Sequence, residues 1–307
     1  MTSVSTGGTP TRATSLLGVM LVVGSAIAWS YGGAIQRFIG VDDGWTLVFW
    51  RCLFAGVFLL CFMLLRDGPA GTRRLFADMG RPGLAIALGF ACISTCFVMA
   101  VSMTPVANVV LFMAAIPLFA ALFARIFIGE PITGITWGAI LAVLIGIAIM
   151  VSGSLGPGAS RLGLLLAGAI ALIFAGMTVI TRSHPGIRMT PAACAGSLIA
   201  ALVAATQAGY LSVSSGDLAL LFAFGALNLG LGMALYVTGA RMIPAALAAL
   251  LGTLEMILAP LWMVLFHGEI PSLRTVGGGT LVLAALFTYL LHQAYRSSKD
   301  AKTAAVT

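Results

Sequence analysis

The sequence predicts an all-α membrane protein of ten transmembrane helices, arranged as two inverted five-helix repeats. Three observations lead to this prediction. Of the 307 residues, 60% are hydrophobic and only 8% are charged; the apolar residues fall into long runs; and the chain aligns with itself. Because soluble globular domains carry about a quarter charged residues, the composition excludes a soluble protein and leaves no room for a soluble domain.

Ten apolar runs are close to the length of about 17 to 25 residues that crosses a bilayer as a helix. The first five runs form a first repeat over 16–151, and the last five form a second repeat over 161–292. A periplasmic linker over 152–160 joins the repeats, and cytoplasmic tails are expected over 1–15 and 293–307. The runs are 16–39, 44–65, 82–103, 106–128, 132–151, 161–182, 190–213, 217–240, 244–266 and 271–292.

The net charge of +7 follows membrane topology, and we expect no nucleic-acid partner. With the N-terminus inside, only Arg37, Arg161 and Arg274 fall on outer segments, and Arg51 lies within a span. An excess of Lys and Arg on cytoplasmic segments is the positive-inside rule, so both termini are predicted to be cytoplasmic. The cytoplasmic residues are Arg12, Arg66, Arg73, Arg74, Arg81, Arg125, Arg182, Arg188, Arg241, Arg296, Lys299 and Lys302.

Two offsets align the halves of the chain. Five spans is an odd number, so the second copy must enter the bilayer from the opposite side. Inverted repeats of this kind build two alternative openings around one midplane site in many secondary transporters; growth of a membrane scaffold by duplication is the alternative. An offset of 139 aligns 97–105 with 236–244 and Gly129-Glu130 with Gly268-Glu269, and an offset of 145 aligns Leu17-Gly18 with Leu162-Gly163, Trp29 with Phe174 and Arg37 with Arg182.

Glu255 is the only carboxylate inside an apolar run. A charge in hydrocarbon costs about 2.5 kcal/mol or more, so it should face a protein interior or a watery cavity. At helical spacing Glu255 shares a stripe with Gly252 and Trp262. The small residues beside the acid leave room either for a neighbouring helix to approach closely or for a ligand or water.

Arg51 is the natural candidate partner of Glu255. At about 1.5 Å per residue, Arg51 lies about 10 Å from the outer end of its span and Glu255 about 16 Å from the inner end of its own. In a core of about 30 Å they are near one level. Three interpretations stay open: a structural ion pair between helices; a site in which Glu255 binds a proton or a substrate amine and Arg51 binds a carboxylate; or two residues that never meet.

Further polar and aromatic residues are candidates for the same volume. Amides avoid lipid-facing positions, so we expect Asn108 and Asn228 to point inward. There, hydrogen bonds across helices are favoured over contact with a solute. Phe112 and Trp29 are interpreted as packing residues rather than as a stacking surface for a solute. The candidates are Asn108, Phe112, Asn228, Tyr236, Trp29 and Tyr31.

Other classes of function have little support in the sequence. An intramembrane enzyme needs a nucleophile with its base or several metal ligands, but the three histidines, His184, His267 and His292, lie at span edges. The five cysteines form no metal-binding pattern, and no metal or other cofactor is expected. A channel would need a ring of like charges or a filter-like sequence. No phosphate-binding loop is present, so a proton or solute gradient is the expected driving force.

The two halves share short motifs in a fixed order, and together these resemble the EamA family of the drug/metabolite transporter superfamily. The family often follows the ninth-span glutamate with proline, whereas here Met256 follows Glu255 and the proline comes at Pro260, so a helix break is expected about one turn later. The motifs are Trp29-Ser30-Tyr31-Gly32, 51–56, 115–119, 129–133, Leu254-Glu255 and 268–271.

The resemblance implies a secondary transporter that exports amino acids or related small metabolites across the bacterial inner membrane by alternating access. A drug, quaternary-cation or nucleotide-sugar carrier of the same superfamily is the alternative. The expected partners are a small-molecule substrate and the lipid bilayer. The pair Gly134/Gly138 and the run at 277–279 predict close helix contact, either within one protomer or between the protomers of a homodimer.

Overall fold

The computed structural model describes residues 12–104, 109, 112–152, 160–268 and 272–304. Within these ranges the chain is helical and contains no strand. The helices are α1 (Arg12–Ser30), α2 (Gly32–Gln36), α3 (Gly44–Asp78), α4 (Gly80–Met103), α6 (Ile116–Phe127), α7 (Gly134–Val151), α8 (Arg161–Ser183), α9 (Thr190–Gln207), α10 (Ser215–Phe222), the π-helix η1 (Ala223–Gly230), α11 (Leu231–Gly239), α12 (Ala245–Gly252), α13 (Leu254–His267) and α14 (Leu273–Ala304).

Eight helical segments of the described chain are long and apolar enough to cross a membrane. They correspond to eight of the predicted spans. Shorter apolar helices occupy the other two: α6 lies in the predicted span 106–128 and α7 in 132–151. The protein is therefore a polytopic helical membrane protein.

Several helices depart from the predicted spans. Helix α3 continues beyond residue 65, the predicted end of the second span, as far as Asp78. It is kinked at Gly68, which has a φ of 68° and is followed by Pro69. Helix α14 likewise runs past residue 292 to Ala304. The first span is divided at Tyr31 into α1 and α2, and the eighth contains η1, a π-helix of the kind that often occurs at functional sites.

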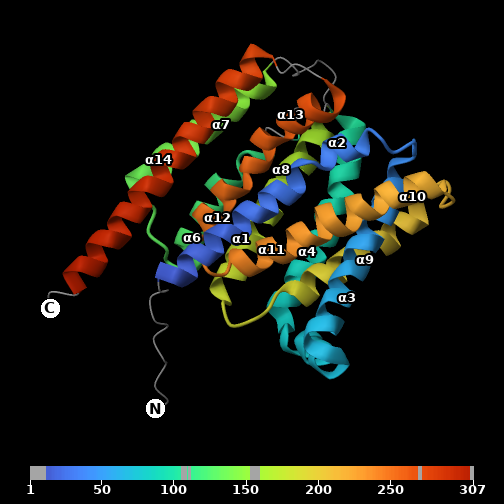
Figure 1. Cartoon of the computed structure of the whole chain (residues 1–307), viewed down its shortest axis with the longest axis horizontal. Coiled ribbons are helices and arrows are strands. Elements are labelled where there is room, and N and C mark those ends of the chain that lie inside the picture. The colour runs from blue at the N-terminus through green and yellow to red at the C-terminus, as the bar shows by residue number, and fades with distance from the viewer. Residues whose placement is uncertain (1–11, 105–108, 110–111, 153–159, 269–271, 305–307) are drawn as a thin grey trace.

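Packing between the two halves of the chain holds the bundle together. Helix α3 packs along α9, α4 against α8 and α9, and α1 against α11, α12 and α13. The pair α7 and α14 runs side by side along one edge of the molecule (Figure 1). The N-terminal end of α1 and the C-terminal end of α14 lie toward the same end of the bundle (Figure 1).

A glycine contact joins α7 to α14, but through a different residue of α7 than predicted. A Cβ on Gly278 would lie 2.3 Å from the carbonyl oxygen of Gly146. A Cβ on Gly134, Gly138 or Gly277 would meet nothing within 4 Å. The prediction for the Gly134/Gly138 pair is therefore wrong within this chain, because a side chain at either position would face open space.

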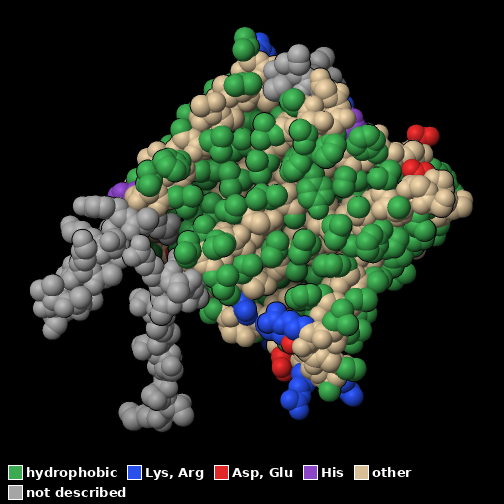
Figure 2. All heavy atoms as spheres, in the orientation of Figure 1, with side chains coloured by type: hydrophobic (Ala, Val, Ile, Leu, Met, Phe, Trp, Pro, Cys, Tyr) green, Lys and Arg blue, Asp and Glu red, His purple; other side chains and the backbone are tan. Residues whose placement is uncertain are grey.

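The outer surface suits a lipid environment. Figure 2 shows a broad face of apolar side chains, with Lys and Arg side chains gathered mainly at its lower edge. Large apolar side chains are exposed on the molecular surface, including Leu165 at 71% and Leu265 at 70%. In water such a surface would drive aggregation, whereas in a bilayer it meets acyl chains.

Candidate functional site

A cavity of about 220 Å³ lies inside the bundle, between the two halves of the chain. Both ionisable residues singled out in the sequence, Arg51 and Glu255, line it, together with Trp29, Tyr236 and Gly252. A Cβ on Gly252 would meet only Tyr236, at 3.9 Å, so this glycine leaves space beside the acid.

A helix break places Glu255 at the cavity. Helix α12 ends at Gly252, and α13 begins at Leu254, which puts Glu255 in its first turn. At the junction the Thr253 hydroxyl donates to the Leu250 carbonyl at 2.7 Å, a local bond that competes with regular helix. An acid in the first turn of a helix is also stabilised by the helix dipole.

The expected position of this break was wrong. Pro260 lies inside α13 without ending it, and the break falls at Thr253, on the N-terminal side of Glu255. The local cause lies at Thr253, whose backbone amide and hydroxyl both donate to the Leu250 carbonyl oxygen, an alternative to the regular helical pattern.

Arg51 is held by two side chains of the π-helix η1. Its guanidinium carbon lies 4.3 Å from the centroid of the Phe224 ring, a cation–π arrangement. Its Nη2 donates to the Asn228 Oδ1 at 3.3 Å. Its Nε is buried and has no hydrogen-bond partner among the described residues. Arg51 is thus oriented but not neutralised.

Arg51 and Glu255 line one cavity without forming an ion pair. No nitrogen–oxygen contact within 4.0 Å joins them in the described part of the chain. Of the three interpretations left open by the sequence, this geometry contradicts only the structural ion pair. Electrostatic interactions are strong in the low-dielectric interior of a helical bundle. A bound zwitterion could place its carboxylate near Arg51 and its amine near Glu255.

Asn228 has a structural role: it links Arg51 to the backbone of α1. Its side chain is fully buried, and Nδ2 donates to the carbonyl oxygens of Ala28 at 2.7 Å and Trp29 at 3.0 Å. These carbonyls precede the division between α1 and α2. A Cβ on Gly32 would lie 3.0 Å from Nδ2, so this position needs glycine for the amide to reach the backbone.

An aromatic wall closes one side of the cavity. The rings of Trp29 and Tyr236 lie 5.4 Å apart, and Phe174 lies 6.4 Å from Trp29 and 5.4 Å from Tyr236. The Tyr236 hydroxyl hydrogen-bonds to that of Thr178 at 2.9 Å. The Trp29 indole packs so closely on Gly232 that a Cβ there would be 2.2 Å from Nε1. Trp29 and Tyr236 therefore combine packing with a place in the cavity wall.

Three other predicted site residues, Tyr31, Trp262 and Phe112, are not among the residues that line this cavity. Tyr31 and Trp262 contact each other edge to face at 6.1 Å, and the Trp262 Nε1 donates to the Ser30 hydroxyl at 2.8 Å, so both support the α1–α2 division. Phe112 is 36% exposed. Asn108 lies outside the described residues.

Sequence reasoning missed several lining or supporting residues, of which Phe174, Phe97 and Phe224 are examples. The repeat was a usable signal for two of them, because its offsets align Phe174 with Trp29 and Phe97 with Tyr236. Phe224 had no such signal, since its role depends on the rotation of η1 against α3.

The fold and this cavity define a polytopic helical membrane protein with separated charges in its interior. The model of the EamA-like transporter family matches residues 16–152 and 161–291. The chain therefore belongs to the EamA-like transporter family, within the drug/metabolite transporter superfamily. It is accordingly a transporter of the drug/metabolite type.

The crystal structure of another protein has a similar fold, with a TM-score of 0.76 and 17% sequence identity. The match covers 91% of this chain and 98% of the other. No curated protein matches the chain.

Proposed function

We propose that this protein is a secondary transporter that exports amino acids or related small metabolites across the bacterial inner membrane by alternating access. The observation that carries the proposal is the presence of Arg51 and Glu255 in one cavity without an ion pair between them. A carrier needs groups that are available to a solute, and a charge already neutralised within the protein is not available.

The solute we propose is a zwitterion with an apolar side chain. Arg51 would bind its carboxylate, since the guanidinium is fixed on Phe224 and Asn228 while its Nε has no partner in the described chain. Glu255 would bind its amine, or a proton that is exchanged for it. The aromatic wall of Trp29 and Tyr236 would cover the side chain.

The ten-helix inverted repeat, which would provide the two alternative openings of alternating access, has support in two matching helix contacts. A Cβ on Gly18 would meet Met242 and Ile243, at 2.8 Å each. A Cβ on Gly163 would meet Met103 and Thr104, at 3.1 Å each. The sequence offsets of 145 and 139 align Gly18 with Gly163 and 103–104 with 242–243, so one contact is repeated between different pairs of helices.

The orientation we propose places both termini in the cytoplasm. The positive-inside rule supports it, and the ends of α1 and α14 lie toward one end of the bundle (Figure 1). With no phosphate-binding loop in the sequence, a proton or solute gradient would drive transport.

Reconstitution in liposomes tests the proposal. Counterflow of a labelled solute, found by a thermal-shift screen of amino acids, should saturate and should respond to an imposed proton gradient. Glu255→Gln should abolish the proton dependence, while Asp42→Asn, which alters an exposed acid, should leave it intact. Unchanged proton dependence in the Glu255→Gln variant would reject a coupling role for this residue.

A carrier of drugs or quaternary cations is the second candidate, because an acid beside an aromatic wall also suits a cation. Quaternary cations, nucleosides and sugars in the same thermal-shift screen distinguish the two. Stabilisation by a quaternary cation with no response to amino acids would favour the second candidate.

A further inference from the structure

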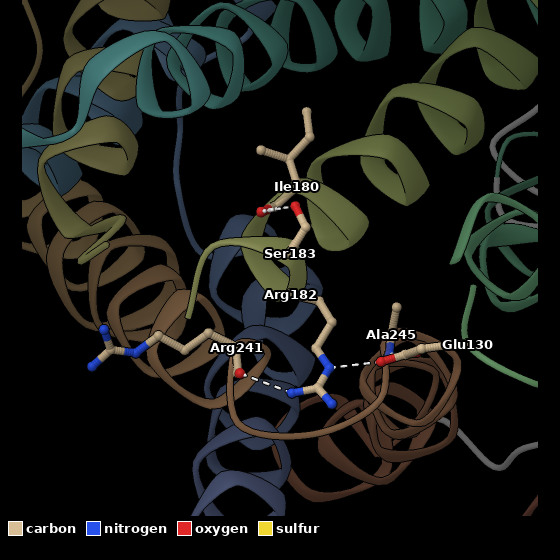
Figure 3. A network of polar contacts seen from close by, with 6 residues as sticks. All are labelled: Glu130, Ile180, Arg182, Ser183, Arg241 and Ala245. Atoms are coloured by element: carbon tan, nitrogen blue, oxygen red, sulfur yellow. Dashed lines mark hydrogen bonds and ion pairs between the residues drawn. The ribbon is translucent and has the colours of Figure 1, made fainter. Parts of the chain in front are cut away.

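An ion pair between Glu130 and Arg182 joins the two halves of the chain at the end of the bundle that carries Arg241. The Arg182 Nε donates to the Glu130 Oε1 at 2.7 Å, and its Nη1 donates to the Arg241 carbonyl oxygen at 3.2 Å. The Ala245 backbone amide donates to the Glu130 Oε2 at 3.3 Å. Figure 3 shows Arg182 and Glu130 pointing toward each other beside the start of α12.

Local structure fixes each partner. Gly129 ends the α6 segment with a φ of +70°, a left-handed conformation that glycine adopts without strain, and the turn directs the next residue, Glu130, across the bundle. Arg182 lies in the last turn of α8, and Ala245 is the first residue of α12. The carboxylate therefore neutralises a guanidinium and also accepts from an amide at a helix N-terminus, where negative charge is favoured.

Both helices held by this carboxylate continue to the central cavity. Helix α12 runs from Ala245 to Gly252, with seven of its eight residues buried, and leads directly into the break that positions Glu255. Helix α8 carries Phe174, about 12 Å from Arg182 at about 1.5 Å per residue. A short helix that moved as a rigid body would therefore carry a displacement at Ala245 to the cavity wall at its other end.

Space for such a movement lies next to the pair. A second cavity, of about 320 Å³, lies among α6, α7, α12 and α14 and is lined by Glu130, Arg182, Thr136 and Tyr289. Both carboxylate oxygens of Glu130 already accept hydrogen bonds, so the cavity offers no unsatisfied charge from this residue to a ligand. The cavity instead provides space into which the turn at Gly129 and Glu130 could move.

We propose that the Glu130–Arg182 pair is a gate latch of the transport cycle. While intact it closes the central cavity toward the solution on the Arg182 side, and it must break for the cavity to open there. This inference rests on the proposed alternating access, but it concerns opening alone and not the identity of the solute or the coupling ion.

A second ion pair supplies a matched control. The Arg188 Nη1 lies 2.8 Å from the Asp67 Oδ1, and the side-chain exposures of 24% and 21% are close to those of Arg182 and Glu130, 21% and 23%. It too joins the two halves of the chain. It connects Asp67, just before the kink of α3, to the turn before α9. Helices α3 and α9 pack along their lengths, so breaking this pair should not open the cavity.

Cys52 reports the opening, because it lines the central cavity and is only 3% exposed. In a variant that retains Cys52 alone, with Cys61, Cys92, Cys96 and Cys194 replaced by Ala, a membrane-impermeant methanethiosulfonate is added to vesicles of either orientation. The labelling reached after the protein is unfolded defines complete reaction of Cys52. No solute is needed, so a failed latch and a wrong solute assignment give distinguishable results.

We expect Glu130→Gln to raise the rate of Cys52 labelling from the Arg182 side about tenfold or more, and Asp67→Asn to leave it within about twofold. Arg182→Gln should act as Glu130→Gln does, which covers the case in which one variant does not fold. The charge-reversed double variant, Glu130→Arg with Arg182→Glu, should restore part of the slow rate. Labelling that is unchanged in both single variants, or raised equally by Asp67→Asn, would overturn the latch.

Discussion

Arg51 donates to Asn228 across 3.3 Å, and the same amide donates to the Ala28 and Trp29 carbonyl oxygens at the end of α1. One buried side chain thus ties the cavity cation to the division of the first span. The amide group uses its acceptor for the charge and its donors for the backbone, so no other residue type of similar size meets both demands.

We expect Asn228→Ala to weaken solute binding about tenfold or more and to lower the free energy of unfolding by about 1 to 3 kcal/mol, because buried carbonyls lose their partner. Asn228→Asp keeps an acceptor for Arg51 but sets a carboxylate against two carbonyls, so it should be at least as damaging. Thermal-shift titration with the solute measures both effects. Gln207→Ala, which removes an exposed amide, is the control; an equal loss there would contradict the assignment.

Gly232 should be intolerant of any side chain. The methyl group in Gly232→Ala would meet the Trp29 indole, whose Nε1 lies 2.2 Å from the site of the added Cβ, and overpacking of this kind costs about 1 to 3 kcal/mol. Because Trp29 also lines the cavity, counterflow should fall with stability. Gly138→Ala, where a Cβ meets nothing within 4 Å, should be nearly neutral. Similar melting temperatures for the two variants would refute this packing.

Neighbouring glycines of α14 should behave differently. Gly278→Ala should push α14 away from Gly146 on α7, while Gly277→Ala should be tolerated because its Cβ would face open space. Close glycine contacts hold membrane helices together without a hydrophobic driving force. We expect a lower melting temperature in detergent for the first variant alone. If both variants have the same melting temperature, α7 and α14 are not joined through Gly278.

Asp43, just before α3, should make stability depend on pH at the end of the bundle opposite the latch. Burial raises the pKa of its carboxyl, but hydrogen bonds from Thr46, Gly209 and Trp45 outweigh it, so the pKa lies below its usual value. A depressed pKa means that the stabilisation is present above the unfolded pKa of about 3.9 and is lost as the pH falls through the folded pKa.

Asp43→Ala should therefore cost about 1 kcal/mol at pH 7, the usual value of a helix N-cap, and the difference from the unaltered protein should shrink below about pH 4. Melting curves from pH 7 to pH 3 measure it. Asp42→Asn is the control. A difference that stays constant down to pH 3 would show that the Asp43 charge makes no contribution.

Local features of the fold were predictable because they depend on residues close together in the sequence. Apolar runs long enough to cross a bilayer indicate helices whatever their neighbours are. Helix ends such as Gly129 and Gly268, both with positive φ, follow from glycine itself. The cavity position of Glu255 was predictable on energetic grounds, since an isolated acid in an apolar run needs an interior that can accept it.

The sequence by itself determined the membrane class, the positions of most spans and the family, because hydrophobic length and order of motifs are properties of the chain alone. Only the tertiary structure decided that Arg51 rests on Phe224 and Asn228 rather than on Glu255, that the break falls at Thr253, and that Gly278 meets Gly146. Each of these depends on how far one helix is rotated and displaced against another. That choice is made by the packing of many side chains at once, and no single stretch of sequence encodes it.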